Sequence, residues 1–332
     1  MKISSLIDIV DGELLNSPSI SFINSIKTDP NRVKTSDLFI AKNIEDLKIA
    51  IENGAYAIIF EKDFEVLDSE VAFIKVENLQ MAMIKIFRFK LSNIKLKSYF
   101  CSTPTFDLFK IYQHNFGENI YLISKNIEKA FKFIDELKDD DILISKDENL
   151  INKIYPNSQE FEKNIYLKNI QNLVKHTLFE ISFSYKDNYF SRIKLPTIYL
   201  NNFLNIYEFL KKDIDAFKLK NYSNFKAIFI DKNFEPLEFG KSSSFIICQN
   251  SLELVKEEIN YIKNEFKYAK TIFIAKNKVN YLKEDEQILL KNLNNLKNLL
   301  LNLDFNCVYM IDFNYKEVLE YLQKPHNSPT LF

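Results

Sequence analysis

The sequence predicts an α/β protein of three domains, in which mostly parallel or mixed sheets carry flanking helices. Short apolar runs of strand length alternate with segments of helical period along most of the chain. The chain has 332 residues, of which 46% are hydrophobic and 14% aromatic, so a sizeable core can form. This length allows two or three domains at roughly 100–200 residues each. We place the domains at residues 1–90, 91–215 and 216–332.

Residues 1–90 alternate helices and strands. We expect helices at 4–10, 44–54 and 78–91, and strands at 37–41, 55–61 and 71–76. Ser4 or Ser5 would cap the first helix, and Gly54 would close the second. A strand, a helix and a second strand at this spacing form a βαβ unit, whose two strands run parallel.

Residues 91–215 continue the alternation and then change character. We expect strands at 97–101, 119–124 and 141–146, followed in turn by helices at 106–113, 127–137 and 148–154. Residues 177–196 instead predict an antiparallel hairpin with its turn at Lys186–Asn188. A helix at 201–213 closes the region.

Residues 216–332 open with a second hairpin-like stretch, 225–240. We expect strands at 243–248, 271–276 and 307–312, and helices at 251–268, 284–303 and 315–324, the first of them capped by Ser251. The helix at 284–303 carries a stripe of leucines, at Leu289, Leu293, Leu296, Leu300 and Leu303. The stripe spans about two heptads, fewer than a coiled coil usually has. We therefore interpret it as a core-facing surface, with a coiled-coil partner as the alternative, and expect a loose tail at 325–332.

Charge and cysteine content exclude several classes of function. Lys and Arg number 44 and Asp and Glu 45, so no net field favours nucleic acid or an anionic membrane. Cys101, Cys248 and Cys307 lie far apart, which argues against a disulfide framework and for a reducing cytoplasm. The N-terminus lacks the apolar segment of a signal peptide, and no stretch approaches roughly 18 uncharged apolar residues, so no membrane-spanning helix is expected.

Glycine is the most informative residue type. The chain has four glycines, at 12, 54, 117 and 240, whereas average usage is roughly 7%. Phosphate-binding loops need clustered glycines, because the backbone must approach phosphates closely and adopt positive φ. No two glycines of this chain are close in the sequence, so neither GxGxxG nor GxxxxGK[ST] can be written anywhere in it.

The strand-to-helix turn at Cys101 has a chemical and a structural interpretation. Ser102, Thr103 and Thr105 follow Cys101, and a helix N-terminus there would lower the pKa of a thiol and offer amides to an anion. Because no glycine or lysine follows, we interpret Cys101 as a buried structural residue. Phosphate binding at the three hydroxyls is the alternative.

Two other polar groups could concern metals. The acidic run at 139–141 could bind a divalent cation, but we interpret it as a solvated turn. His114, His176 and His326 have no metal-ligand spacing, so no metal site is expected.

Two stretches of the first domain resemble the Mur ligase family. They are TDPNRVKTSDLFIA at 28–41 and NGAYAIIFEK at 53–62. The family carries TDSR-x-V-x-x-GDLF-x-A and then a helix ending in GA before an apolar strand, and the branch that adds D-Ala-D-Ala (MurF-like) is the most similar. DGELLN at 11–16 looks like the family's GG-x-LL element, and weaker similarity follows in the right order.

The resemblance implies a Mur-ligase-like architecture for the whole chain. Residues 1–90 would be the UDP-substrate-type domain, 91–215 a shortened central ATP domain and 216–332 the C-terminal α/β domain. Substrate binding carries over to Thr28, Asp29 and Arg32, although Pro30 replaces the family's Ser and Asn31 is an insertion.

Departures from the family pattern decide the function that we expect. The family's ATP loop, of the form TGSNGKTTT, should follow the first strand of the central domain, where this chain has FCSTPTFDL at 100–108. Both glycines and the lysine are missing, and they are the groups that cradle and neutralise phosphates. A counterpart of the family's Mg²⁺-binding Glu is also missing. ATP and Mg²⁺ are therefore not supported as cofactors, and Ser102, Thr103 and Thr105 mark a degenerate phosphate loop.

The sequence thus predicts a cytoplasmic pseudoenzyme: a non-catalytic Mur-ligase-like protein with an interaction or regulatory role in peptidoglycan precursor synthesis. Expected partners are a UDP-MurNAc-peptide or a cell-wall synthesis protein, without nucleic acid or membrane insertion. Two alternatives stay open. One is an ATP-dependent UDP-MurNAc-tripeptide–D-Ala-D-Ala ligase of altered mechanism, and the other is a UDP-sugar-peptide binding protein.

Overall fold

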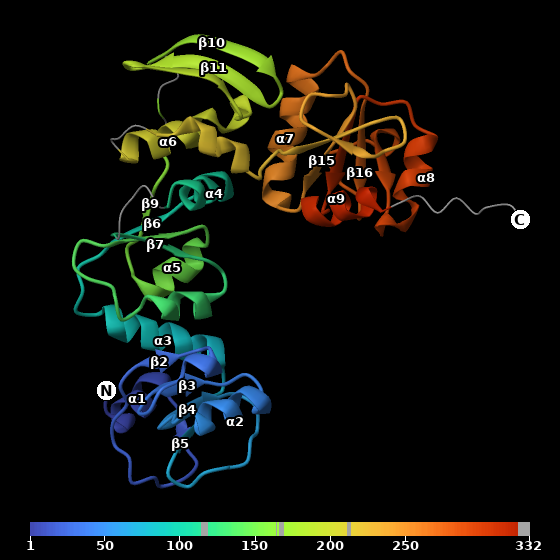
Figure 1. The fold of residues 1–332 in the computed structure, drawn as a ribbon. Helices are drawn as coiled ribbons and strands as arrows, with labels where there is room; N and C mark the ends of the chain where they lie inside the picture. The colour runs from blue at the N-terminus through green and yellow to red at the C-terminus, as the bar shows by residue number, and fades with distance from the viewer. Residues whose placement is uncertain (114–118, 164, 166–168, 211–213, 325–332) are drawn as a thin grey trace, which may run out of the picture. The chain divides into compact units, whose positions relative to one another are not determined.

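The computed structural model describes residues 1–113, 119–163, 165, 169–210 and 214–324 (Figure 1). The chain forms two compact units, Met1–Lys163 and Asn164–Phe332, and each unit holds two sheets. The predicted α/β class is confirmed. The division into three domains at 90 and 215 stays a prediction. Among the described residues, no helix is both long and apolar enough to cross a membrane.

The first sheet of unit 1 is parallel except at one edge. Its strand order is β1-β5-β4-β3-β2, and only β1 runs antiparallel to its neighbour. The strands are β1 (Glu13–Leu14), β2 (Ile26–Lys27), β3 (Leu38–Ile40), β4 (Ala57–Phe60) and β5 (Ala72–Lys75), and the helices are α1 (Ile3–Val10), η1 (Pro30–Arg32, 3-10), α2 (Ile44–Glu52) and α3 (Leu79–Leu91). The predicted βαβ unit is β3-α2-β4, and Gly54 follows α2 in the left-handed conformation with φ +95°.

The second sheet of unit 1 is entirely parallel, with the strand order β7-β8-β6-β9. Its strands are β6 (Lys97–Phe100), β7 (Ile120–Ile123), β8 (Ile142–Ser145) and β9 (Gln159–Glu160), and its helices are α4 (Thr103–Tyr112), η4 (Ile127–Lys132, 3-10) and α5 (Glu148–Ile154). All β strands and helices expected at 97–154 are present, but the helix predicted at 127–137 is a short 3-10 helix.

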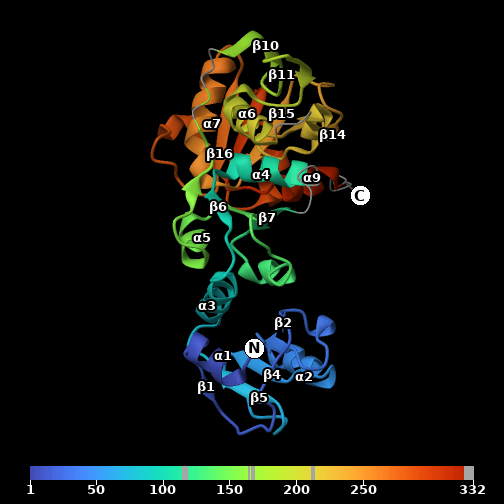
Figure 2. The ribbon, with the colours of Figure 1, turned by 90° about the vertical axis from the view of Figure 1, so that its left-hand side faces the viewer.

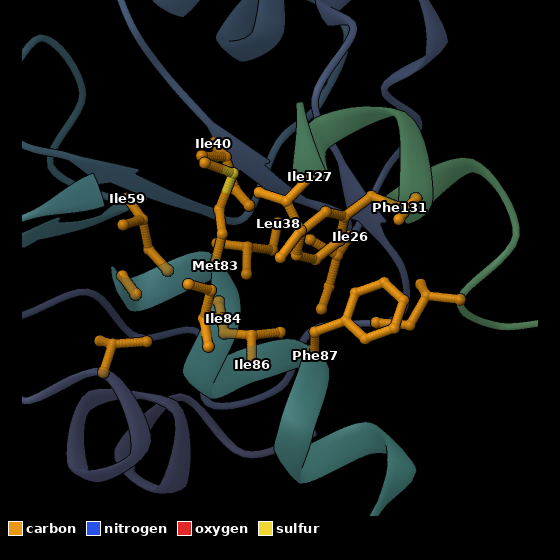
Figure 3. Close-up of a cluster of buried hydrophobic side chains, with 14 of the residues drawn as sticks. Ile26, Leu38, Ile40, Ile59, Met83, Ile84, Ile86, Phe87, Ile127 and Phe131 are labelled. Atoms are coloured by element: carbon orange, nitrogen blue, oxygen red, sulfur yellow. The ribbon is translucent and has the colours of Figure 1, made fainter. Parts of the chain in front are cut away.

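One hydrophobic core joins the two sheets of unit 1. Helix α3 lies between them in both ribbon views (Figure 2) and contacts α1, α5 and η4. Its Met83 and Phe87 face Leu38 of the first sheet, while Ile127 and Phe131 of η4 close the same cluster (Figure 3). The face of the first sheet that carries Ile26, Leu38 and Ile40 is therefore fixed against the second sheet by buried apolar side chains.

Unit 2 combines an antiparallel sheet with a mixed sheet. The antiparallel sheet has the order β10-β11-β12, and the mixed sheet has the order β14-β13-β15-β18-β16-β17, in which β13 and β14 are antiparallel. The strands are β10 (Ile170–Thr177), β11 (Glu180–Tyr185), β12 (Asn188–Ile193), β13 (Ala227–Ile230), β14 (Pro236–Leu237), β15 (Phe245–Gln249), β16 (Thr271–Ala275), β17 (Gln287–Leu289) and β18 (Cys307–Ile311). The helices are η6 (Thr197–Tyr199), α6 (Leu200–Leu210), η7 (Ala216–Asn221), α7 (Leu252–Glu265), η8 (Glu284–Glu286), η9 (Leu293–Asn295), α8 (Leu296–Leu301) and α9 (Tyr315–Gln323). Both predicted hairpins, β11-β12 and β13-β14, are confirmed.

Two secondary-structure predictions are wrong. Residues 284–303 do not form one helix: β17 pairs with β16 at the sheet edge, and only Leu296–Leu301 is α-helical. Residues 287–289 pair with β16 at the sheet edge, and the Gln287 amide also donates to the carbonyls of Val279 and Leu282, which ties this strand to the preceding loop. The first helix begins after Lys2, so neither Ser4 nor Ser5 is its cap. The tail 325–332, His114 and His326 lie outside the described residues.

Candidate functional site

A cavity of about 520 Å³ opens where β3 and β4 end in unit 1. Ala41 and Lys42 follow β3, and Glu61 and Lys62 follow β4. The loop after β7 and the start of η4 contribute residues 125–128. In parallel α/β sheets, ligands bind outside the carboxyl ends of the strands, and pockets of this size hold small molecules. This cavity is therefore the candidate ligand site.

The first turn of α3 borders the cavity. Leu79 and Gln80 line it, and the backbone N–H of Leu79 donates to the Glu61 carboxylate at 2.9 Å. Asn78 caps the helix by accepting from the Met81 N–H at 2.8 Å. The Glu61 carboxylate thus accepts from an N–H group of the first turn of α3. The N-terminus of a helix stabilises a negative charge at that position.

The cavity has an excess of positive charge. Lys42, Lys62 and Lys125 line it together with Glu61 and Glu128, and Glu128 forms an ion pair with Lys42. The Glu61 carboxylate is hydrogen-bonded to α3, and within the described part of the chain neither Lys62 nor Lys125 forms an ion pair. Lys62 and Lys125 are therefore the two lysines of the cavity that are available to an anionic ligand.

Among the residues predicted to bind substrate, Thr28 lies closest to this cavity. Its hydroxyl donates to the Glu128 carbonyl at 3.4 Å, so Thr28 contacts the wall that Glu128 forms. Asp29 caps η1 by accepting from the Asn31 N–H at 3.1 Å and pairs with Arg32 at 3.6 Å on the exposed surface. Neither Asp29 nor Arg32 lines the cavity.

Ser102, Thr103 and Thr105, predicted to mark a degenerate phosphate loop, lie at the start of α4, at the carboxyl end of β6. The Ser102 N–H donates to the Glu162 carboxylate at 2.7 Å, and the Ser102 hydroxyl donates to Thr105 at 3.3 Å. Thr103 and Thr105 are buried. Strand β9 places Glu162 there, because Phe161 N–H donates to the Phe100 carbonyl at 2.9 Å beside β6.

Cys101 is a buried thiol, as the structural interpretation predicted. Burial raises its pKa well above the ordinary value, and the charges of Glu162 and Asp107 raise it further. The thiolate form that nucleophilic chemistry needs is therefore disfavoured at this helix N-terminus.

The acidic run at 139–141 holds a turn together. Asp139 accepts from the Lys95 N–H at 2.8 Å, Asp141 accepts from the Lys138 N–H at 2.7 Å, and Asp140 is left-handed with φ +69°. The described residues contain no cluster of three or more His, Cys, Asp or Glu side chains that could hold a metal ion.

Sequence reasoning missed Lys62, Lys125 and Glu162. A lysine directly after a predicted strand was a weak signal for Lys62. Lys125 gave the same weak signal, because it directly follows the strand predicted at 119–124. Glu162 gave none, because it lies 60 positions away from Ser102, whose N–H it accepts.

Comparison with known proteins identifies the fold. No protein-family model matches the sequence, and no curated protein is significantly similar to it. Solved structures match over most of their length. A MurF ligase from Thermotoga maritima in complex with ADP is 14% identical, with 90% of this chain and 97% of that chain covered and a TM-score of 0.53. MurF from Acinetobacter baumannii is 10% identical, with 97% and 99% covered and a TM-score of 0.57.

The chain has a Mur-ligase-like fold. The resemblance inferred from the first-domain motifs is thus confirmed for the architecture. At 10 to 14% identity, the similarity to MurF establishes the fold alone.

Proposed function

We propose that this chain is a non-catalytic Mur-ligase-like protein, a pseudoenzyme that acts in the cytoplasm by interaction or regulation in peptidoglycan precursor synthesis. The start of α4 carries this proposal. An ATP loop presents free backbone N–H groups to phosphate, whereas here the Ser102 N–H already binds a carboxylate of the same chain at 2.7 Å.

The residues around Ser102 do not fit ATP. A phosphate there would have to displace Glu162, whose negative charge would repel it. No glycine stands between Phe100 and Leu108, so the backbone cannot form the open cradle. Lys110, the only lysine of α4, pairs with Asp107 at 2.8 Å and lies over the Phe106 ring. This position therefore lacks the glycine cradle and an uncommitted lysine of α4, which the family's phosphoryl transfer requires.

The test is a ligation assay with UDP-MurNAc-tripeptide, D-Ala-D-Ala, ATP and Mg²⁺. We expect neither ADP nor ligated product above an enzyme-free control, with MurF from Acinetobacter baumannii as the positive control. Glu162→Gln should also be inactive, since the lysine and glycines remain missing. Turnover by the wild-type protein that requires all three substrates would overturn the proposal and favour the ligase of altered mechanism.

Binding of a UDP-sugar-peptide at the unit 1 cavity is a second candidate function. The observation that favours it is the pair of lysines, Lys62 and Lys125, at the carboxyl ends of the strands. A diphosphate accepts several charge-assisted hydrogen bonds, and lysines without a carboxylate partner provide them without breaking an existing ion pair. One structure of the same fold, from Acinetobacter baumannii, is named as a UDP-N-acetylmuramoylalanyl-D-glutamyl-2,6-diaminopimelate–D-alanyl-D-alanyl ligase, which favours a precursor of this class.

Calorimetry with UDP-MurNAc-tripeptide tests this second candidate. We expect Lys62→Gln and Lys125→Gln each to weaken binding about tenfold, the loss of one hydrogen bond to a charged group. Lys48→Gln, an exposed lysine of α2 outside the cavity, is the matched control and should bind like the wild type. No heat at high micromolar ligand would leave only the scaffold role.

A further inference from the structure

A second cavity of about 520 Å³ lies in unit 2, on the outer edge of the antiparallel sheet. Strand β12 forms one wall, and α6 and η7 form the other. It is separate from the unit 1 cavity and from the degenerate phosphate loop, so what it binds does not depend on the function proposed above.

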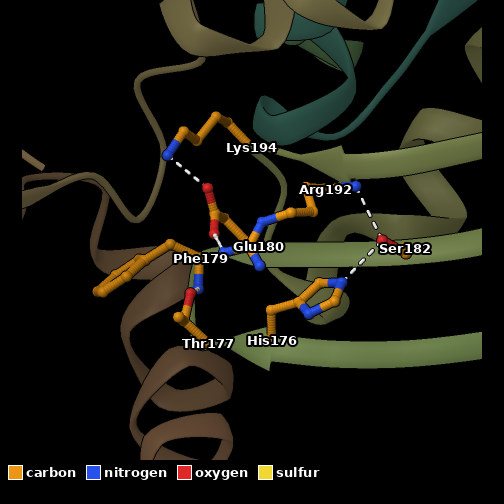
Figure 4. Close-up of polar contacts among 7 residues, drawn as sticks. All are labelled: His176, Thr177, Phe179, Glu180, Ser182, Arg192 and Lys194. Carbon is orange, nitrogen blue, oxygen red and sulfur yellow. Dashed lines mark hydrogen bonds and ion pairs between the residues drawn. The ribbon is translucent and has the colours of Figure 1, made fainter. Parts of the chain in front are cut away.

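The described lining of this cavity is cationic. Arg192, Lys194 and Lys220 line it, and none of its described lining residues is acidic. Glu180, behind them in β11, is buried and binds both Arg192, at 2.9 Å, and Lys194 (Figure 4). Burial alone would raise the pKa of Glu180, but the hydrogen bonds and charges of Lys194 and Arg192 lower it, so the carboxylate is ionised. Two cations share one carboxylate, which leaves positive charge facing the cavity.

The backbone at Arg192 is arranged to present that side chain. Arg192 has φ +46°, which is uncommon for a residue with a side chain, and it lies at a register shift between β11 and β12. The Ser182 hydroxyl accepts from the Arg192 N–H at 2.8 Å and is also bonded to His176 Nε2 at 2.7 Å (Figure 4). A β-bulge changes the direction of a side chain at the expense of some backbone strain. Here the bulge directs the Arg192 guanidinium toward the Glu180 carboxylate and the rim of the cavity.

The three cations are not equally available. Lys194 is held between Glu180 and the Phe239 ring, 3.2 Å from the ring centroid. Arg192 uses one nitrogen for Glu180 and keeps further donors, since a guanidinium has five N–H groups. Lys220 has no ion pair among the described residues and lies over the Phe217 ring at 4.1 Å. Arg192 and Lys220 are therefore the groups that an anion would reach.

Two large aromatic rings of the same cavity face solvent. The exposed fraction is 64% for Tyr189 and 72% for Phe217. Exposed rings beside cations form a surface on which a planar ring stacks while its charged group is bound. Two simpler explanations account for only part of this arrangement. Solvated surface lysines do not explain the exposed rings beside them, and a structural ion pair at Glu180 does not explain the cavity.

We propose that this cavity binds a small organic anion in which an aromatic ring carries a phosphate or a carboxylate. Arg192 and Lys220 bind the anionic group, and Phe217 and Tyr189 hold the ring. Glu180 is a positioning residue that orients the guanidinium, and it makes no contact with the ligand.

The experiment follows binding to the full chain by ligand-observed NMR with phenyl phosphate, phenylacetate, inorganic phosphate and benzyl alcohol. Phenyl phosphate or phenylacetate should bind saturably at millimolar concentration, and whichever binds more tightly identifies the anionic group. Inorganic phosphate, without a ring, and benzyl alcohol, without a charge, should each bind at least about fivefold more weakly than the better aromatic anion. Absence of saturable binding by both aromatic anions would overturn the proposal.

Two exposed residues serve as variants, because neither threatens folding. We expect Lys220→Gln and Phe217→Ser each to weaken the better aromatic anion about threefold to fivefold, as for an exposed charge or ring contact. The matched controls are Lys267→Gln and Tyr268→Ser. These two exposed residues form a similar pair outside this cavity, with Lys267 Nζ 5.1 Å from the centroid of the Tyr268 ring. Equal weakening in the variants and in the controls would show non-specific binding and refute the site.

Discussion

Replacing Gly54 by alanine tests why this glycine follows helix α2. Gly54 has φ +95°, and a Cβ built on it would lie 3.0 Å from Thr35 Oγ1, 3.1 Å from Thr35 Cα and 3.3 Å from Thr35 N. The Gly54 carbonyl also accepts from the Ser36 N–H at 3.1 Å, so the turn before β3 is tied to the end of α2. Two separate costs therefore arise, one from the backbone conformation and one from crowding.

Gly240 separates these two costs. It also has positive φ, +77°, but a Cβ there would have no atom within 4 Å. The left-handed conformation costs alanine roughly 1–2 kcal/mol, and the lower entropy of the unfolded chain returns about 0.4–1 kcal/mol. Crowding against backbone atoms, which cannot rotate away, adds roughly 1–3 kcal/mol. We expect Gly54→Ala to cost about 2–4 kcal/mol in the free energy of unfolding of unit 1, and Gly240→Ala about 1 kcal/mol in unit 2.

The chain forms two compact units, so the assay must read each one separately. Urea titration followed by hydrogen-exchange mass spectrometry does this, with peptides around β4 for unit 1 and peptides around β15 for unit 2. The prediction concerns the difference between the two glycines. Equal losses in the two variants would show that Thr35 contributes nothing and that the left-handed conformation alone explains both glycines.

Three further predictions concern buried polar groups. Burial raises the pKa of Glu258, so its contribution to stability is present at low pH and is lost as the pH rises through the raised value. Glu258→Gln should therefore gain stability relative to the wild type as the pH rises above the ordinary range of a glutamate pKa, measured by urea midpoints at acidic and at neutral pH. The thiols of Cys101, Cys248 and Cys307 are buried, and burial raises the pKa of each. Ellman's reagent should therefore label the native protein far more slowly than the urea-unfolded chain, and labelling at equal rates would contradict this prediction. The buried Asp37 carboxylate accepts hydrogen bonds from two backbone N–H groups, those of Ser25 at 3.2 Å and Lys34 at 3.0 Å. Asp37→Asn should lower the free energy of unfolding by about 1–3 kcal/mol, because an amide has only one oxygen to accept them.

Local patterns were sufficient for most of the fold. The β3-α2-β4 unit and the two hairpins were predictable because neighbouring segments pair with each other and carry their own turn residues; Asp231, for example, accepts from the N–H groups of Asn233 and Glu235 in the β13-β14 turn. Prediction failed where pairing with a strand distant in the sequence determines the secondary structure. Gln287–Leu289 has helical periodicity, but it pairs with β16 as an edge strand. Strand β10 was missed because seven of its eight residues are exposed, which leaves no alternation of apolar and polar residues.

The candidate site was less predictable than the fold. Thr28 was predicted, but its partner Glu128 lies 100 positions away, in a segment predicted only as a helix. The carboxylate that accepts from the Ser102 N–H lies 60 positions away, two residues after a strand of only two residues. Both contacts depend on which strands of a parallel sheet become neighbours, and hydrophobic periodicity does not encode the strand order.

The motif on which the family resemblance depends has mainly structural roles in this chain. Within TDPNRVKTSDLFIA, Asp29 caps η1, Asp37 holds two backbone N–H groups, and Leu38 packs against α3. Gly54, the other matching residue, closes α2 against Thr35. A chain needs these residues to build the fold whether or not it binds substrate, so their presence indicates architecture rather than activity. The functions proposed above depend instead on groups that folding does not require: the lysines of the unit 1 cavity, and the Ser102 N–H, which in this chain donates to Glu162.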